Sequence, residues 1–212
     1  MNPIITNYEK IKNVVNNTNI NIIAVSKSFR YDHIEPLINY GHKHFGENKV
    51  QEAQAKWIKI KETIPNLNLH MIGRLQSNKA KDAIKLFEYI HSVDNPKLAS
   101  LLSKYEILLK KKRKYFIQVN LGNEKQKSGI HIKDLDTFYT FCSKELNLNI
   151  LGLMAIPPND GNEGEYFRKL MELNLSLGLK ELSMGMSNDF QEALKFKTTF
   201  IRIGSAIFGN RF

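Results

Sequence analysis

Short apolar segments alternate along the chain with longer amphipathic segments. The short ones are rich in β-branched and aromatic residues, which is typical of buried strands. They predict eight strands, at residues 22–26, 44–46, 69–73, 89–93, 115–120, 150–156, 181–184 and 199–203. The segments between them have the apolar spacing and the length of helices. These helices are expected at residues 49–62, 77–87, 97–112, 134–145, 163–177 and 190–196.

Eight β/α units with near-continuous apolar strands indicate a parallel sheet that helices cover, and eight strands close a barrel. We therefore expect one α/β domain over residues 1–212, a TIM (β/α)8-type barrel. The alternative is an open doubly wound sheet, but no Gly-x-Gly-x-x-Gly follows the first expected strand, where a dinucleotide-binding fold would place it. No outer helix is expected after the eighth strand. The amphipathic segment 4–15 would cover that side as an extra N-terminal helix.

Composition narrows the class of protein. The chain has 212 residues of which 42% are apolar, enough for a continuous core. Residues 1–4 lack a basic region followed by an apolar stretch, and no run approaches the roughly 20 apolar residues of a membrane span. The single cysteine, Cys142, cannot form an internal disulfide, which agrees with a reducing compartment. We expect a soluble, cytoplasmic protein that is neither exported nor bound to a membrane.

The formal net charge of +10 raises the alternative of a nucleic-acid-binding protein. Of the 31 basic residues, however, 25 are lysine and 6 are arginine, and arginine is the better reader of bases and phosphates. The one dense basic run, residues 110–114, follows a helical pattern, so its cations would complement the carboxyl end of that helix. We expect no specific nucleic-acid partner.

The first expected strand ends abruptly in Lys27. An amine at the edge of a dry core has its pKa lowered by burial, and the freed lone pair can form a Schiff base with a carbonyl compound. Taken alone, a lysine at a strand end is more often a hydrated surface residue with a packed stem. For Lys27 the functional interpretation is favoured instead, because residues suited to binding a phosphate lie at the end of the last expected strand.

Arg202, Gly204 and Ser205 combine a fixed positive charge with bare backbone N–H groups, which suits a phosphate. The preceding strand leads into a second donor-rich turn, which contains Ser187. In a barrel these groups lie at the carboxyl ends of strands, where the chemistry of the fold takes place and where phosphate often binds after strands seven and eight. A carbonyl compound that carries a phosphate would satisfy Lys27 and this cluster together.

Polar residues also follow the other expected strands. The barrel is inferred from the apolar pattern alone, so the position of these polar residues is independent support for it. These residues are Glu47, Asn48, Arg74, Asp94 and Asn120.

Three further features are interpreted as structural. Ser77 is expected to be the N-cap of the helix at 77–87, and Asn95 the N-cap of the next helix, with Pro96 at its first position. The six histidines are scattered, and His42 and His44 lack a Cys or carboxylate partner at ligand spacing, so no metal site is expected.

These residues belong to motifs in which the chain closely resembles the pyridoxal phosphate homeostasis proteins, the YggS/PROSC family. The resemblance covers nearly the whole chain, and its motifs are specific when taken together. They lie at residues 24–27 (AVSK), 44–48 (HFGEN), 70–79 (HMIGRLQSNK), 91–94 (HSVD), 118–120 (QVN), 152–154 (GLM), 182–187 (LSMGMS) and 202–209 (RIGSAIFG).

The resemblance implies a single fold-type III barrel, like the N-terminal domain of alanine racemase, that holds pyridoxal 5′-phosphate as a Schiff base on Lys27. It also implies that Ser187, Gly204 and Ser205 hold the phosphate and that Arg202 faces the pyridine nitrogen. Asn48 would lie near the phenolic oxygen of the cofactor.

The same resemblance implies a role in vitamin B6 homeostasis without an established reaction. We expect apo-enzymes that use the cofactor as recipients, and a monomer rather than a stable oligomer. A slow amino-acid racemase is the alternative. Racemisation needs acid/base groups on both faces of the substrate carbon, and alanine racemase takes one from a second domain and a partner subunit. The chain departs from its relatives at Lys197, where glycine is usual because the turn is expected to need a left-handed residue.

Overall fold

Eight parallel strands close into a barrel in this computed structural model, which describes residues 2–16, 19–122 and 128–209. The strand order is β4-β3-β2-β1-β9-β8-β7-β5, and pairing of β4 with β5 closes the ring. A short strand, β6 (Ile130–His131), pairs with the carboxyl end of β5. The barrel strands are β1 (Asn21–Val25), β2 (His44–Glu47), β3 (Asn68–Met71), β4 (Tyr89–Val93), β5 (Lys114–Asn120), β7 (Ile150–Met154), β8 (Glu181–Met186) and β9 (Phe200–Ile203). The expected (β/α)8 barrel is therefore confirmed, and the open sheet is not formed.

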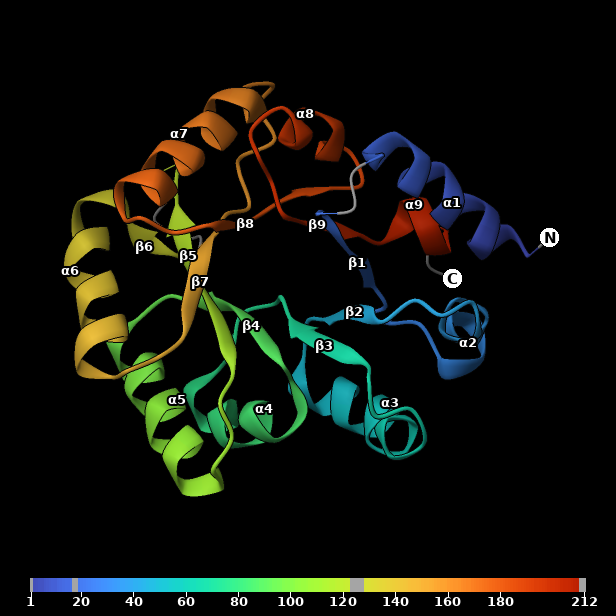
Figure 1. Cartoon of the computed structure of the whole chain (residues 1–212), viewed down its shortest axis with the longest axis horizontal. Coiled ribbons are helices and arrows are strands. Elements are labelled where there is room, and N and C mark those ends of the chain that lie inside the picture. Colours follow the sequence, from blue (N-terminus) through green and yellow to red (C-terminus); the bar gives the residue numbers. More distant parts are fainter. Residues whose placement is uncertain (1, 17–18, 123–127, 210–212) are drawn as a thin grey trace.

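Helices surround the barrel on its outer side (Figure 1). They are α1 (Pro3–Val15), α2 (Tyr31–Asn39), α3 (Val50–Thr63), α4 (Ala80–Leu86), α5 (Pro96–Leu109), α6 (Leu135–Thr140), α7 (Glu163–Ser176), α8 (Phe190–Leu194) and α9 (Ser205–Phe208).

The N-terminal helix α1 covers the side of the barrel where the chain ends, as the sequence predicts. It lies beside α9 in Figure 1, and the Asn7 side-chain amide donates to the carbonyl of Ile207 at 3.2 Å. The expectation of no helix after the last strand is wrong, because the one-turn helix α9 follows β9.

Two other expectations need correction, and the helices expected by residue range also leave out α2, which runs through Pro36. The helix expected at 134–145 is three pieces, a 3-10 turn (Ile132–Asp134), α6 and a π-helix (Phe141–Glu145). Ser77 is not a cap, since it opens a 3-10 turn whose N-cap is Gln76.

Other predicted features are confirmed. The Asn95 side chain accepts the backbone N–H of Leu98 at 2.9 Å, with Pro96 at the start of α5. Lys197 has φ of +57°, so the turn before β9 does adopt the left-handed conformation that favours glycine.

Two apolar layers hold the barrel together. The outer layer packs the helices on the strands and includes the fully buried pair Trp57 and Phe45, whose ring centroids lie 5.0 Å apart. The inner layer fills the barrel with Ile23, Tyr89, Phe116, Met154 and Phe200. The inner layer leaves room for polar side chains, three of which are histidines.

The basic run at 110–114 is bound within the chain. The Lys112 ammonium donates to Glu106 and to the carbonyl of Asn147, while the Arg113 side chain donates to the carbonyl of Ile84. These contacts tie the end of α5 and the start of β5 to neighbouring elements, which supports a structural interpretation of the run. Among the described residues, no helix combines the length and the apolar character needed to cross a membrane.

Candidate functional site

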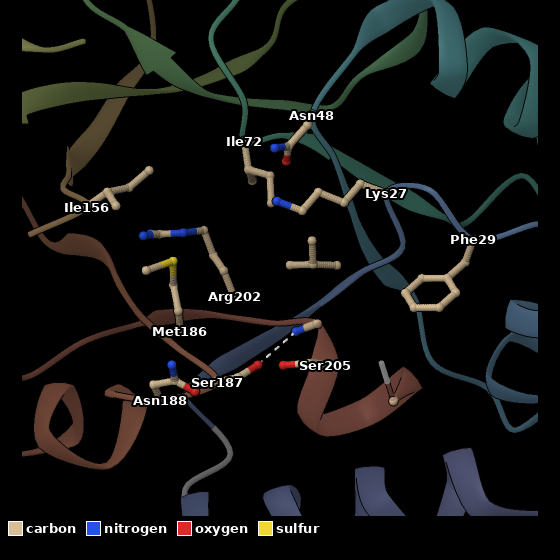
Figure 2. Close-up of a pocket in the computed structure, with 13 residues that line it drawn as sticks. Lys27, Phe29, Asn48, Ile72, Ile156, Met186, Ser187, Asn188, Arg202 and Ser205 are labelled. Carbon is tan, nitrogen blue, oxygen red and sulfur yellow. Dashed lines mark hydrogen bonds between the residues drawn. The ribbon is translucent and has the colours of Figure 1, made fainter. Parts of the chain in front are cut away.

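A cavity of about 490 Å³ opens at the carboxyl ends of the barrel strands. It contains all six residues that the sequence singles out, from the ends of β1, β2, β8 and β9. Figure 2 shows Lys27 and Asn48 on one side, Arg202 between, and Ser187 and Ser205 on the opposite side. The six residues are Lys27, Asn48, Ser187, Arg202, Gly204 and Ser205.

Lys27 extends into the cavity from a segment that is fixed in place. The preceding residue, Ser26, is fully buried, and its backbone N–H donates to the carbonyl of Gly46 at 3.0 Å. Its hydroxyl donates to the Glu47 carboxylate at 2.8 Å, and the Lys56 ammonium donates to its carbonyl at 2.7 Å. The base of the Lys27 side chain is therefore anchored on both strands β1 and β2.

Asn48 reaches the cavity because Gly73 allows a close backbone approach. A Cβ atom at Gly73 would lie 2.4 Å from the carbonyl oxygen of Asn48 and 2.7 Å from its Cα, which no side chain tolerates. The glycine of the GRLQ segment thus lets the chain after β3 pass against the chain after β2.

Two turns meet on the opposite side of the cavity. The Ser187 hydroxyl oxygen accepts the backbone N–H groups of Gly204 at 3.2 Å and Ala206 at 3.4 Å. Asp189 accepts the N–H of Met186 and so holds the first turn. Two backbone donors from the end of β9 therefore converge on one oxygen at the cavity wall.

Arg202 is buried and lies between the two sides of the cavity. Its guanidinium donates to the Ser183 hydroxyl at 2.8 Å and to the carbonyl of Ala155 at 2.9 Å. Burial lowers the pKa of Arg202 to about 10, and the nearby Asp189 opposes this effect. The group remains a cation at neutral pH, held by neutral acceptors at its back.

The remaining polar residues at strand ends do not join this cavity. Glu47 is fully buried and faces α3, where it accepts from Ser26, Lys56 and Trp57. Arg74 and Asn120 line an adjoining cavity of about 380 Å³ that shares Asn48, Ile72 and Ile156 with the first.

The fourth such residue, Asp94, accepts from the side chain of Asn95. Apolar side chains at the strand ends or just after them complete the first cavity, and the sequence patterns do not single them out. They include Phe29, Ile72, Ile156 and Met186.

Sequence reasoning also missed a cluster of histidines inside the barrel. His44, His70 and His91 lie on β2, β3 and β4 and are hydrogen-bonded to one another through ring nitrogens, at 3.0 and 2.9 Å. All three histidines lie within predicted strands, but the separate motifs that contain them do not show that their side chains meet. Among the described residues, no group of three or more His, Cys, Asp or Glu side chains is arranged to hold a metal ion.

Comparison with known proteins gives consistent results. A family model described as the alanine racemase N-terminal domain matches residues 1–211. A pyridoxal phosphate homeostasis protein from Vibrio cholerae is 38% identical over 204 residues, which cover 92% of this chain and 86% of the relative. The structure of PipY from Synechococcus elongatus with PLP bound is 33% identical, with a TM-score of 0.90 over 97% of this chain and 100% of that chain. An alanine racemase from Clostridium difficile, 15% identical with a TM-score of 0.77, covers 100% of this chain with 57% of its own and shares the fold.

Proposed function

Because the chain belongs to the alanine racemase N-terminal domain family, and within it to the pyridoxal phosphate homeostasis proteins, we propose that it binds pyridoxal 5′-phosphate and serves vitamin B6 homeostasis. The cofactor would lie in the cavity at the carboxyl ends of the barrel strands. PipY, which is similar over its whole length, is described with PLP bound.

The observation that carries this proposal is the convergence of backbone N–H groups on the Ser187 hydroxyl. The N–H groups of Gly204 and Ala206 both point to this one oxygen. Such a pair of donors suits a phosphate oxygen, and the hydroxyls of Ser187 and Ser205 can add further bonds. A Cβ atom at Gly204 would come no closer than 3.5 Å to Val25, so packing within the chain does not demand glycine there. Close approach of a phosphate to the backbone does explain it.

The Lys27 side chain lines the cavity (Figure 2), which supports it as the residue that binds the cofactor covalently. The cofactor supplies an aldehyde, and the Lys27 amine would attack it and form a Schiff base as water leaves. The buried anchors on Ser26 hold the start of this side chain, so little freedom of the backbone is lost on binding.

Arg202 and Asn48 would contact the ring. A guanidinium is a donor at every nitrogen, so a pyridine nitrogen opposite Arg202 would accept a hydrogen bond and remain unprotonated. An unprotonated ring is a weak electron sink for carbanion chemistry, which supports binding without robust catalysis. The Asn48 amide would donate to the phenolic oxygen.

In the cell we place the protein in the cytoplasm as a single-domain monomer, with PLP-dependent apo-enzymes as recipients of the cofactor. A specific nucleic-acid partner is not proposed, because Lys112 and Arg113 of the basic run already bind acceptors within the chain. The likeness to alanine racemase concerns the fold, and a low racemase activity stays as the alternative.

Borohydride reduction tests the proposal directly. We expect purified protein incubated with the cofactor to absorb in the visible range, to lose that band on reduction, and to carry the reduced adduct on Lys27 in peptide mass spectra. Lys27→Ala should lose the adduct and retain some non-covalent cofactor. Lys49→Ala is the matched control, because Lys49 also follows a barrel strand but is exposed and paired with Glu52. An adduct on another lysine would contradict the assignment.

A further inference from the structure

A continuous line of hydrogen bonds crosses the interior of the barrel and ends at Arg202. The guanidinium donates to the Ser183 hydroxyl at 2.8 Å, and this oxygen lies 2.9 Å from Nδ1 of His91. His91 Nε2 lies 2.9 Å from Nδ1 of His70, and His70 Nε2 lies 3.0 Å from Nδ1 of His44. The line connects the cavity with the opposite end of the barrel, where His44 begins β2.

The register of the strands explains how the line forms. Gly46, two residues after His44, pairs with His70, and Tyr89 pairs with His70 in turn, two residues before His91. Side chains two residues apart on a strand face the same side, so each histidine stands one interior layer nearer the cavity than the last. Ser183 on β8 then receives the line from across the barrel.

Rings inside the barrel hold the histidines in place. His70 stacks on Tyr89, with centroids 4.3 Å apart and planes at 14°, and His91 stacks on Phe116 at 4.3 Å and 16°. Both histidines are fully buried. Stacking fixes the ring planes, so the nitrogens have one set of neighbours.

The hydrogen-bond pattern gives the line a direction. Ser183 is fully buried, and the partners of its hydroxyl among the described residues are Arg202, which only donates, and Nδ1 of His91. The hydroxyl proton therefore goes to Nδ1 of His91, and a neutral His91 must carry its own proton on Nε2. The same logic assigns the Nε2–H form to His70 and then to His44.

The surroundings keep these imidazoles neutral. Burial lowers the pKa of His70 and His91 well below the usual range, and the Arg202 cation adds to the effect at His91. Burial, with Lys114 and Lys43 nearby, lowers the pKa of His44 to about 4. A neutral imidazole donates once and accepts once, as the line requires.

We propose that His91, His70 and His44 are positioning residues for Arg202, because they fix the Ser183 hydroxyl with its lone pairs toward the guanidinium. Arg202 is thereby bound from behind, and its remaining donors face the cavity. The inference rests on the proposed function, since it assigns the line a role in cofactor binding. Loss of the hydrogen bond between His70 and His91, which does not involve Arg202 or Ser183, should therefore weaken binding of pyridoxal 5′-phosphate.

The direction of the line can be tested without any cofactor. In protein labelled with ¹⁵N at histidine, long-range ¹H–¹⁵N spectra at pH 7.5 distinguish the two neutral forms of each ring. We expect His44, His70 and His91 all in the Nε2–H form, assigned by the loss of each signal in single variants. A proton on Nδ1 of His91 would reverse the line and overturn the proposal, whether or not the protein binds the cofactor.

The effect on Arg202 is tested with His70→Phe, which keeps the stacked ring and contacts neither Ser183 nor Arg202. We expect the Kd for pyridoxal 5′-phosphate to rise roughly ten-fold and the absorption band of the bound cofactor to shift. Tyr89→Phe is the matched control, because this ring stacks on His70 but lies outside the line, and it should change neither quantity. Melting temperatures of both variants show whether the fold survives.

A double variant separates positioning from a general loosening of the core. Ser183→Ala alone cuts the line next to Arg202, so adding His70→Phe should raise the Kd no further. Additive losses, or a His70→Phe variant that binds like Tyr89→Phe, would show that the histidines do not act through Ser183. If wild-type protein fails to bind the cofactor, the proposed function is wrong, and the NMR result still decides the direction of the line.

Discussion

The ammonium of Lys56 lies 2.9 Å from the carboxylate of Glu47, in an ion pair whose side chains are 10% and 0% exposed. The same ammonium donates to the carbonyl of Ser26, and the same carboxylate accepts from its hydroxyl. This buried pair therefore holds together the ends of β1 and β2 directly behind Lys27.

Removal of one partner should be costly. Lys56→Met leaves the Glu47 carboxylate buried without its cation, so we expect the free energy of unfolding in a urea titration to fall by about 3 to 5 kcal/mol. The exposed pair of Lys49 and Glu52, 2.8 Å apart, is the control, because Lys49→Met should cost less than about 1 kcal/mol. Equal losses in the two variants would mean that the buried pair has no special role.

Ser205 gives a test of the phosphate position. Its side chain is exposed, so neither Ser205→Ala nor Ser205→Asp should unfold the protein. Ser205→Ala removes one donor and should weaken binding of pyridoxal 5′-phosphate by about 1 to 3 kcal/mol. Ser205→Asp adds like-charge repulsion and should abolish binding. In titrations, pyridoxal without its phosphate should bind wild type poorly and barely distinguish the variants, whereas equal affinity for both compounds would exclude a phosphate site.

Buried histidines should make stability depend on pH. The pKa values of His42 and His44 are lowered to about 4, chiefly by burial, against about 6.5 in an unfolded chain. The unfolded state therefore binds more protons between pH 6.5 and 4. Stability is complete above pH 6.5 and falls by about 1.4 kcal/mol per pH unit for each such histidine as the pH decreases toward 4.

Urea titrations between pH 5 and 7.5 measure this slope. His70 and His91 should add to it, because their pKa values are lowered in the same direction. His42→Gln keeps a hydrogen-bonding side chain without a titrating group, so its slope should be smaller by about 1.4 kcal/mol per pH unit. An unchanged slope would mean that His42 is not neutral in the folded protein.

The strands were predictable because buried parallel strands are short, almost entirely apolar runs, and the site was predictable because its residues follow those runs. Patterns failed where a local signal was ambiguous. Ser77, for example, has the residue type of a helix cap without its geometry. The line through His70 and His91 depends on strand register and on closure across the barrel, which spacing along one chain does not contain.

Lys197 provides a prediction that the sequence and the structure share. Its φ of +57° strains a residue with a side chain, so Lys197→Gly should raise the free energy of unfolding by about 1 kcal/mol. Lys195 in the same turn is exposed and right-handed, with φ of −69°, and Lys195→Gly should lower stability instead. Thermal unfolding of the two variants gives the comparison, and a loss of stability in both would show that the turn at Lys197 is not strained.

Racemase activity is the alternative function, and the residues that line the cavity allow a prediction about it. Racemisation needs one acid/base group on each face of the substrate carbon. Among the described residues that line the cavity, Lys27 and Arg202 are the titratable side chains, and Arg202 is held as a cation by Ser183 and Ala155. The Lys27 amine can therefore act as the acid/base group on one face of the substrate carbon, and the described residues of the cavity supply no second group for the other face. We expect protein loaded with pyridoxal 5′-phosphate to convert L-alanine or L-serine no faster than the free cofactor does, in chiral chromatography over several hours. Lys27→Ala should give the same background, whereas turnover above background that disappears in this variant would make the protein a racemase.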